Sequence, residues 1–190
     1  MKFETLSSKI TYHGKVFDVR QDHVGLPNGT TTQIDIVIHN GSVAILPLDG
    51  QGMLWFVRQY RHAAQDDLLE VPAGTLEVGE DPEMCARREI REEIGMSAGR
   101  VVKVGEFFLA PGYSTEYMYV YLATDLKPDP LQGDADEFLS VEKIPLDEAF
   151  QLAETGQLRD CKTYAALILA RRRLSQLASR LQPGDGLTGE

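Results

Sequence analysis

The chain has 190 residues, and 19 Lys and Arg against 29 Asp and Glu give it a net charge of −10. This acidic balance argues against a nucleic-acid or anionic-membrane partner, because phosphate groups attract Lys and Arg. No apolar run approaches the roughly 20 residues of a membrane span, the N-terminus lacks a signal-peptide core, and two cysteines are too few for a disulfide scaffold, so we expect a cytoplasmic protein.

The first 40 residues contain two segments rich in Val, Ile, Phe and Thr, at 9–24 and 30–38. The Asn28-Gly29 pair lies between them, and this dipeptide is the strongest short signal for a β-hairpin. The sequence therefore predicts a small antiparallel sheet. Tyr12 and Phe17 could stack on a nucleotide base, but aromatic residues in strands more often pack in a core.

The next apolar segments, 42–48 and 53–60, flank Asp49-Gly50 and predict a second hairpin. A brief strand is expected over 68–71, where Pro72 ends it because proline cannot donate a ladder hydrogen bond. Residues 73–80 follow as a loop with glycines near both ends.

A helix is predicted over Pro82–Ile94. Asp81 is a preferred N-cap residue, Pro82 fits the first helical position, and Gly95 fits the position just after a helix. The rest of the chain predicts strands at 101–109 and 117–124, an acidic loop at 129–137, helices at 146–154 and 160–181, and a tail at 182–190. Hairpins mixed with a few helices indicate α/β or α+β layering.

The helix over 82–94 carries three carboxylates on one face. At about 100° per residue, Glu92 lies about −60° and Glu93 about +40° from Glu89. Three clustered oxygen donors suit Mg²⁺ or Mn²⁺, which prefer carboxylate and water ligands. The alternative is a solvated helix face, because Glu is a common surface helix former.

A longer pattern surrounds these glutamates. It runs from 74 to 96, and its fixed positions are Gly74, Glu80, Arg88, Glu89, Ile90, Glu92, Glu93, Gly95 and Met96. These match every fixed position of the Nudix box, so the chain resembles a Nudix hydrolase. The resemblance implies an α/β fold, a Nudix-type α/β/α sandwich with a mixed sheet over 41–181. It also implies that the N-terminal sheet over 1–40 dimerises two copies of the chain.

The resemblance further implies a metal site for Mg²⁺ or Mn²⁺. Its ligands would be Glu89, Glu92, Glu93 and the Ala73 carbonyl, supported by Glu80 and Arg88. Similar enzymes often take a catalytic base from an acidic loop, here Glu137 first and Asp134 second, in a loop that also holds Asp136. The box glutamates Glu92 and Glu93 are the alternative proton acceptors.

Flanking residues resemble the ADP-ribose pyrophosphatase subfamily. They are the segments 58–61 (Arg-Gln-Tyr-Arg) and 70–74 (Glu-Val-Pro-Ala-Gly), together with Pro111, fifteen residues beyond Met96. This implies hydrolysis of ADP-ribose to AMP and ribose 5-phosphate, with substrate bound by Arg61, Arg58, Glu70 and Glu116. The alternatives are another nucleoside diphosphate sugar such as GDP-mannose, a dinucleoside polyphosphate beside Tyr113, or a non-catalytic nucleotide-sugar sensor.

Overall fold

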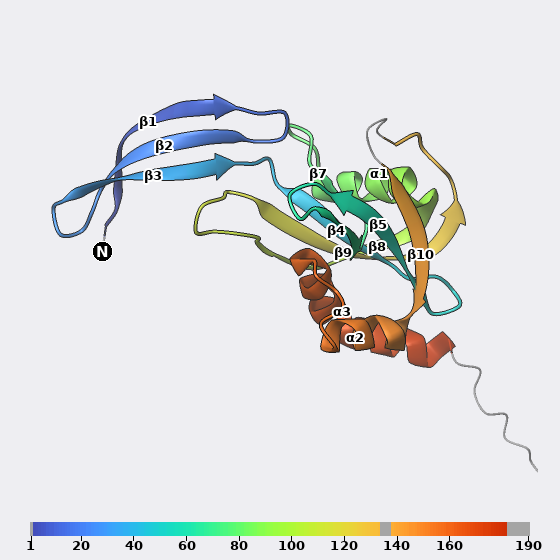
Figure 1. Ribbon diagram of the computed structural model, residues 1–190. Helices are drawn as coiled ribbons and strands as arrows, with labels where there is room; N and C mark the ends of the chain where they lie inside the picture. Colours follow the sequence, from blue (N-terminus) through green and yellow to red (C-terminus); the bar gives the residue numbers. More distant parts are fainter. Residues whose placement is uncertain (1, 134–137, 182–190) are drawn as a thin grey trace, which may run out of the picture.

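The computed structural model describes residues 2–133 and 138–181 (Figure 1). The described part of the chain forms ten strands and three helices. The strands are β1 (Glu4–His13), β2 (Asp18–Gly25), β3 (Thr31–Ile38), β4 (Ser42–Pro47), β5 (Met53–Arg61), β6 (Asp66–Glu70), β7 (Ala73–Thr75), β8 (Met96–Phe108), β9 (Tyr117–Pro128) and β10 (Leu139–Pro145). The helices are α1 (Pro82–Ile94), α2 (Leu146–Glu154) and α3 (Cys161–Leu181).

The main body is a three-layer sandwich. Its four-stranded sheet has the order β7-β4-β9-β8, and it is mixed because β4 runs parallel to β9 but antiparallel to β7. A second, antiparallel sheet has the order β10-β5-β6. Helix α1 covers one side of these sheets, and α2 and α3 cover the other (Figure 1). The predicted α/β/α architecture with a mixed sheet is confirmed.

Strand β4 shows how the core is divided between the two helical layers. All six of its residues are buried, as expected for a central strand covered on both faces. Ala44 and Leu46 belong to the apolar cluster that includes α3, while Val43 and Ile45 belong to the cluster that includes α1. This alternation follows from the two-residue period of a strand, and it anchors both helices that reach the site.

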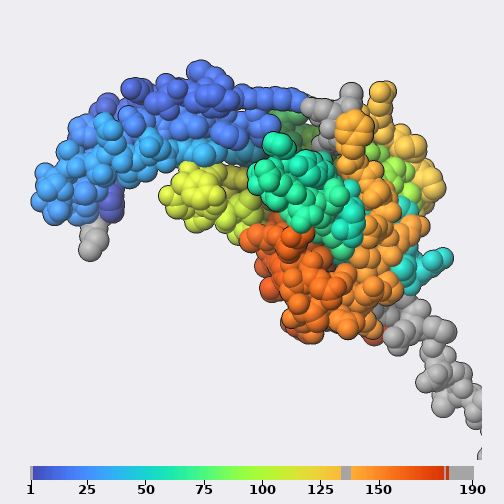
Figure 2. Space-filling model, in the orientation of Figure 1, coloured from blue at the N-terminus to red at the C-terminus, as the bar shows by residue number. Residues whose placement is uncertain are grey.

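The N-terminal sheet is antiparallel, has the order β1-β2-β3, and projects from the body as an arm (Figures 1 and 2). The hairpin predicted at Asn28-Gly29 is confirmed, since Gly25 pairs with Thr31 on either side of the turn. The single strand predicted over 9–24 is wrong. It is divided by a turn in which the Gly14 N–H donates to the Phe17 carbonyl, a break that a strand-like composition does not signal.

Two further expectations about strands are wrong. The segments at 42–48 and 53–60 turn at Asp49 and meet in one antiparallel bridge, Leu48–Leu54, but they then diverge into β4 and β5 of different sheets instead of forming an extended hairpin. Tyr12 and Phe17 are exposed instead of packing in a core, because no layer formed by residues 2–133 or 138–181 covers β1. Strand β10 was not predicted, and β7 lies within the expected loop.

The helix predictions are closer to the structure. Helices α1 and α2 have the expected bounds, and α3 begins one residue later than expected. The expected tail at 182–190 lies outside the described residues. In the described part of the chain, no helix combines the length and apolar character required to cross a membrane.

Candidate active site

Local sequence chemistry fixes where helix α1 begins and ends. Asp81 Oδ1 accepts hydrogen bonds from the backbone N–H groups of Glu83 (2.9 Å) and Met84 (3.2 Å). Gly95 closes the helix with a left-handed φ of 69°, and its N–H donates to the Ile90 carbonyl. Such caps satisfy backbone groups that a helix leaves unpaired at its ends. These caps fix the ends of α1, and its buried residues Ala86, Ile90 and Ile94 orient it against the sheet.

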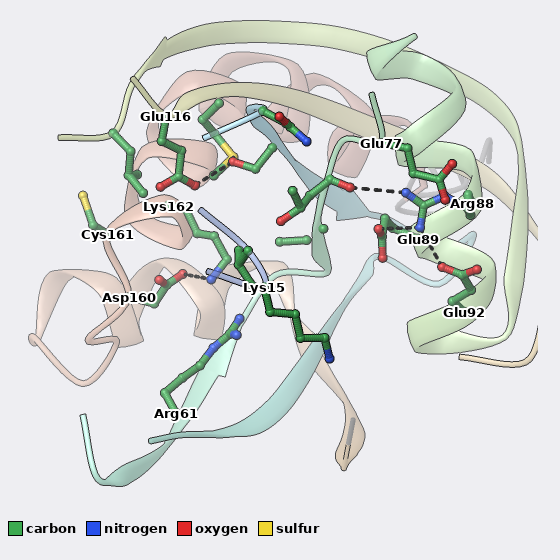
Figure 3. Close-up of a pocket in the computed structure, with 18 residues that line it drawn as sticks. Lys15, Arg61, Glu77, Arg88, Glu89, Glu92, Glu116, Asp160, Cys161 and Lys162 are labelled. Atoms are coloured by element: carbon green, nitrogen blue, oxygen red, sulfur yellow. Dashed lines mark hydrogen bonds and ion pairs between the residues drawn. The ribbon is translucent and has the colours of Figure 1, made fainter. Parts of the chain in front are cut away.

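The three predicted carboxylates lie along one edge of α1. Glu89 and Glu93 are largely buried, with 8% and 6% of their surface exposed. Glu93 Oε2 accepts a hydrogen bond from the Ala73 N–H of β7 at 3.0 Å. Glu89 Oε1 and Glu92 Oε2 both accept from Arg88 Nη1, at 2.7 and 2.9 Å (Figure 3). The α1 edge is thus joined to β7 on one side and to Arg88 on the other.

Arg88 also binds the loop that precedes the helix. Its Nε and Nη2 donate to the two carboxylate oxygens of Glu80, at 3.1 and 3.0 Å. The hydrogen bonds to Glu80 and the charge of Glu89 raise the Arg88 pKa above its already high ordinary value, so the guanidinium is positively charged. In return, hydrogen bonding to Arg88 lowers the Glu80 pKa. Of the two supporting residues expected from the box, Arg88 contacts Glu89 and Glu92 directly, and Glu80 is linked to them through Arg88.

The donor set fits a hard divalent cation. Carboxylate oxygens are the ligands that Mg²⁺ and Mn²⁺ prefer, and Gly74 leaves room for one of them. A Cβ at Gly74 would lie 1.8 Å from Glu89 Oε1, so only glycine admits the carboxylate there. Within residues 2–133 and 138–181, no three acidic, His or Cys side chains converge closely enough to hold an ion as they stand, and Arg88 bridges Glu89 and Glu92 instead.

A cavity of about 720 Å³ opens beside this edge (Figure 3). Of the residues predicted from sequence, it brings together Arg61, Ala73, Glu89, Glu92 and Glu116. These come from β5, β7, α1 and the turn before β9. Charged side chains from several elements line the cavity, so it suits a charged ligand.

Arg61 and Glu70, both predicted to bind substrate, are bound to each other. Arg61 Nε and Nη2 donate to the two Glu70 oxygens at 2.8 and 2.7 Å, a bidentate pair. Glu70 is only 1% exposed. Burial alone would raise its pKa, but the hydrogen bond from Arg61 and the charge of Lys162 outweigh burial and lower the pKa. Glu70 therefore acts as an ionised anchor that fixes the Arg61 guanidinium at the cavity wall.

Lys162 and Asp160 are among the cavity residues that sequence reasoning missed. Lys162 lies in the first turn of α3, where its Nζ contacts Glu70 and lies 3.1 Å from Asp160 Oδ2. Asp160 caps the same helix, accepting from the Thr163 N–H at 3.0 Å and hydroxyl at 2.6 Å. The sequence does show an Asp at a helix start. Nothing local indicates that this start faces β6, some 90 residues earlier in the chain.

The other predicted residues are placed as follows. Glu116 Oε1 accepts a hydrogen bond from the Ser42 hydroxyl at 2.8 Å on the cavity wall. Arg58 pairs with Glu142 of β10 and lines a different cavity, so the structure does not bring it to the glutamate edge. Tyr113 is exposed in the turn that leads to β9. The candidate bases Asp134 and Glu137, with Asp136, lie outside the described residues.

Comparison with known proteins agrees with this geometry. The family model described as "NUDIX domain" matches residues 38–167. An ADP-ribose pyrophosphatase of Bacillus subtilis (strain 168) is 36% identical over 86% of this chain and 90% of its own. A methanol dehydrogenase activator of Bacillus methanolicus is 35% identical, with the same coverage. A GDP-mannose pyrophosphatase of Yersinia pestis (strain Pestoides F) is 31% identical over 82% of this chain and 81% of its own.

A solved structure, described as the crystal structure of an ADP compounds hydrolase, resembles most of the chain. It superposes with a TM-score of 0.84 at 26% sequence identity, covering 93% of this chain and 96% of that one. Since this coverage extends well beyond the family-model match, the resemblance includes part of the N-terminal arm.

Proposed function

The chain belongs to the NUDIX domain family and is a Nudix hydrolase, and from this premise we propose that it cleaves the pyrophosphate of ADP-ribose to give AMP and ribose 5-phosphate. One structural observation carries the proposal. The carboxylate edge of α1 and the anchored Arg61 line one cavity, so metal-binding oxygens and a phosphate-binding cation face the same space. Relatives described as an ADP-ribose pyrophosphatase and an ADP compounds hydrolase support this choice of substrate.

Glu89, Glu92, Glu93 and the Ala73 carbonyl are the groups that would hold Mg²⁺ or Mn²⁺. A divalent cation bound there would neutralise phosphate oxygens and lower the pKa of a coordinated water. The protein itself contributes to catalysis by holding these metal-binding groups in position. The Ala73–Glu93 hydrogen bond joins β7 to α1, so the carbonyl and the carboxylates keep a fixed spacing. Such positioning contributes much of the rate in phosphoryl transfer.

Arg61 supplies the second charge in this scheme. Its bond to Glu70 fixes the guanidinium plane, so little side-chain entropy is lost when it binds a phosphate oxygen. Glu70 thus supports substrate binding through Arg61 rather than by touching the nucleotide. For proton abstraction we retain Glu137 and Asp134 as proposed bases, with Glu92 and Glu93 as the alternative.

The arm supports a homodimer as the proposed assembly. Every residue of β1 is exposed, and the arm carries exposed Phe3, Leu6, Ile10 and Tyr12. An exposed strand that carries several large apolar side chains suits contact with a second copy of the chain. Sedimentation velocity should give twice the chain mass of 21.1 kDa, and Ile10→Glu should shift the protein towards monomer. A wild-type monomer at micromolar concentration would contradict the proposal. A cytoplasmic location stays a prediction.

The direct test is incubation of the pure protein with ADP-ribose and Mg²⁺, followed by chromatography of the nucleotides. AMP should form with wild-type protein and not with Glu92→Gln. GDP-mannose belongs in the same substrate panel, because one relative is described as a GDP-mannose pyrophosphatase. A higher kcat/KM for GDP-mannose than for ADP-ribose would replace the proposed substrate. Absence of turnover on every nucleoside diphosphate sugar would favour the alternative of a nucleotide-sugar sensor.

A further inference from the structure

The cavity has two ends of different chemistry. One end is the glutamate edge of α1, with Glu89 and Glu92. At the other end are Asp160 and Lys162 of the α3 start and Glu116 of the turn before β9, which Figure 3 shows across the cavity from that edge. Because the pyrophosphate must lie at the metal-binding end, one of the two groups that it links must extend towards α3.

At the α3 end, the charged side chains are paired with one another. The Lys162 side chain is 11% exposed, and its Nζ is held between the carboxylates of Glu70 and Asp160. Thr163 is fully buried, and its hydroxyl accepts from the Val71 N–H at 3.0 Å while donating to Asp160. A buried ammonium group is costly unless it is paired. Here the pairing also ties the start of α3 to the segment that leads into β7.

The donors and acceptors at this end suit hydroxyl groups. Lys162 donates, whereas Asp160 and Glu116 only accept. A phosphate placed here would meet two carboxylates, but a sugar hydroxyl can donate to a carboxylate and accept from an ammonium group. Among the described residues that line the cavity there is no aromatic ring, so a base would lack a stacking surface.

We propose that Lys162 and Asp160 bind the hydroxyls of the sugar on the non-nucleoside side of the pyrophosphate, and so determine which nucleoside diphosphate sugar is accepted. This inference rests on the proposed function, because it takes the α1 edge as the place of the pyrophosphate. It adds two specificity-determining residues that the Nudix box does not contain. Both derive their position from α3 rather than from the catalytic helix.

The test measures binding rather than turnover. Titration calorimetry with Mg²⁺ present would compare ribose 5-phosphate and AMP on wild-type protein, Lys162→Met and Asp160→Asn. Asn is an equally good N-cap, so the second variant preserves the helix start. We expect each variant to weaken ribose 5-phosphate at least tenfold and AMP less than twofold. Arg159→Met is the matched control, since Arg159 pairs with exposed Asp66 outside this cavity, and both affinities should stay at wild-type values.

The outcomes are distinct. Loss of AMP binding with ribose 5-phosphate retained would place the nucleoside at α3 and overturn the proposal, and so would an equal loss of both. If Lys162→Met does not fold, Asp160→Asn carries the same comparison. If wild-type protein releases no AMP from ADP-ribose, the proposed function fails. In that case a selective loss of sugar-phosphate binding in the variants still supports the sugar site.

Discussion

Gly74→Ala should disable the site without unfolding the protein. The new methyl carbon would lie 1.8 Å from Glu89 Oε1 and 1.9 Å from its carboxyl carbon. Non-bonded atoms approach to about 3.3–3.5 Å, so the carboxylate must retreat by about 1.5 Å. That retreat disrupts the 2.7 Å hydrogen bond from Arg88 and removes one proposed metal ligand. Because a 1 Å misplacement costs on the order of 10²-fold, we expect kcat/KM to fall by about that factor.

The assay is AMP release from ADP-ribose over a Mg²⁺ titration, with the melting temperature measured in parallel. A displaced ligand should also raise the Mg²⁺ concentration needed for half-maximal rate. Gly50→Ala is the matched control, because a Cβ there meets nothing within 4 Å, and its activity and melting temperature should stay at wild-type values. Wild-type turnover of Gly74→Ala at the same Mg²⁺ concentration would refute the role given to the Glu89 carboxylate.

Three other changes test separate parts of the structure. Glu93→Gln should lower kcat by two or more orders of magnitude while circular dichroism shows an intact fold; full activity would exclude Glu93 as a ligand or base. Asp81→Ala removes two N-cap hydrogen bonds and should cost about 1 kcal/mol of unfolding free energy in urea, against no change if the cap is dispensable. Because the Glu70 pKa is lowered by folding, its contribution is complete above the unfolded pKa of about 4.3 and is lost as pH falls through the folded value. Wild-type protein should therefore lose more stability than Glu70→Gln on acidification below that pH, and parallel curves would contradict the anchored ion pair.

The sequence predicted best those features that depend on residues close together in the chain. Helix α1 has its expected bounds because Asp81 and Gly95 act on backbone groups within a few positions of themselves. The helical period then places Glu89, Glu92 and Glu93 on one edge. Both steps use separations of five residues or fewer, so a single sequence contains all the information that they require.

Contacts between residues far apart in the chain could not be predicted from the sequence alone. Residues 42–48 have the pattern of a hairpin strand, yet β4 pairs with β9, more than 70 residues later. The α3 end of the cavity also depends on contacts between residues far apart in the sequence. Glu70 was expected as a substrate ligand, but its carboxylate is occupied by Arg61 and Lys162, and Lys162 lies 92 positions away. No local period or cap indicates such a contact.

The distribution of charge explains why these two ends of the cavity differ. Around Arg88 and Ala73, one guanidinium faces four glutamates, at positions 80, 89, 92 and 93, so the α1 end carries a surplus of negative charge. Around Glu70, Arg61 and Lys162 pair with the carboxylates of Glu70 and Asp160, so this part of the cavity carries no comparable surplus. A pyrophosphate is itself an anion, so it can approach the α1 end only with divalent cations between them. At the α3 start, Lys162 can donate to a sugar hydroxyl and Asp160 can accept from one, while Arg61 remains available to a phosphate oxygen.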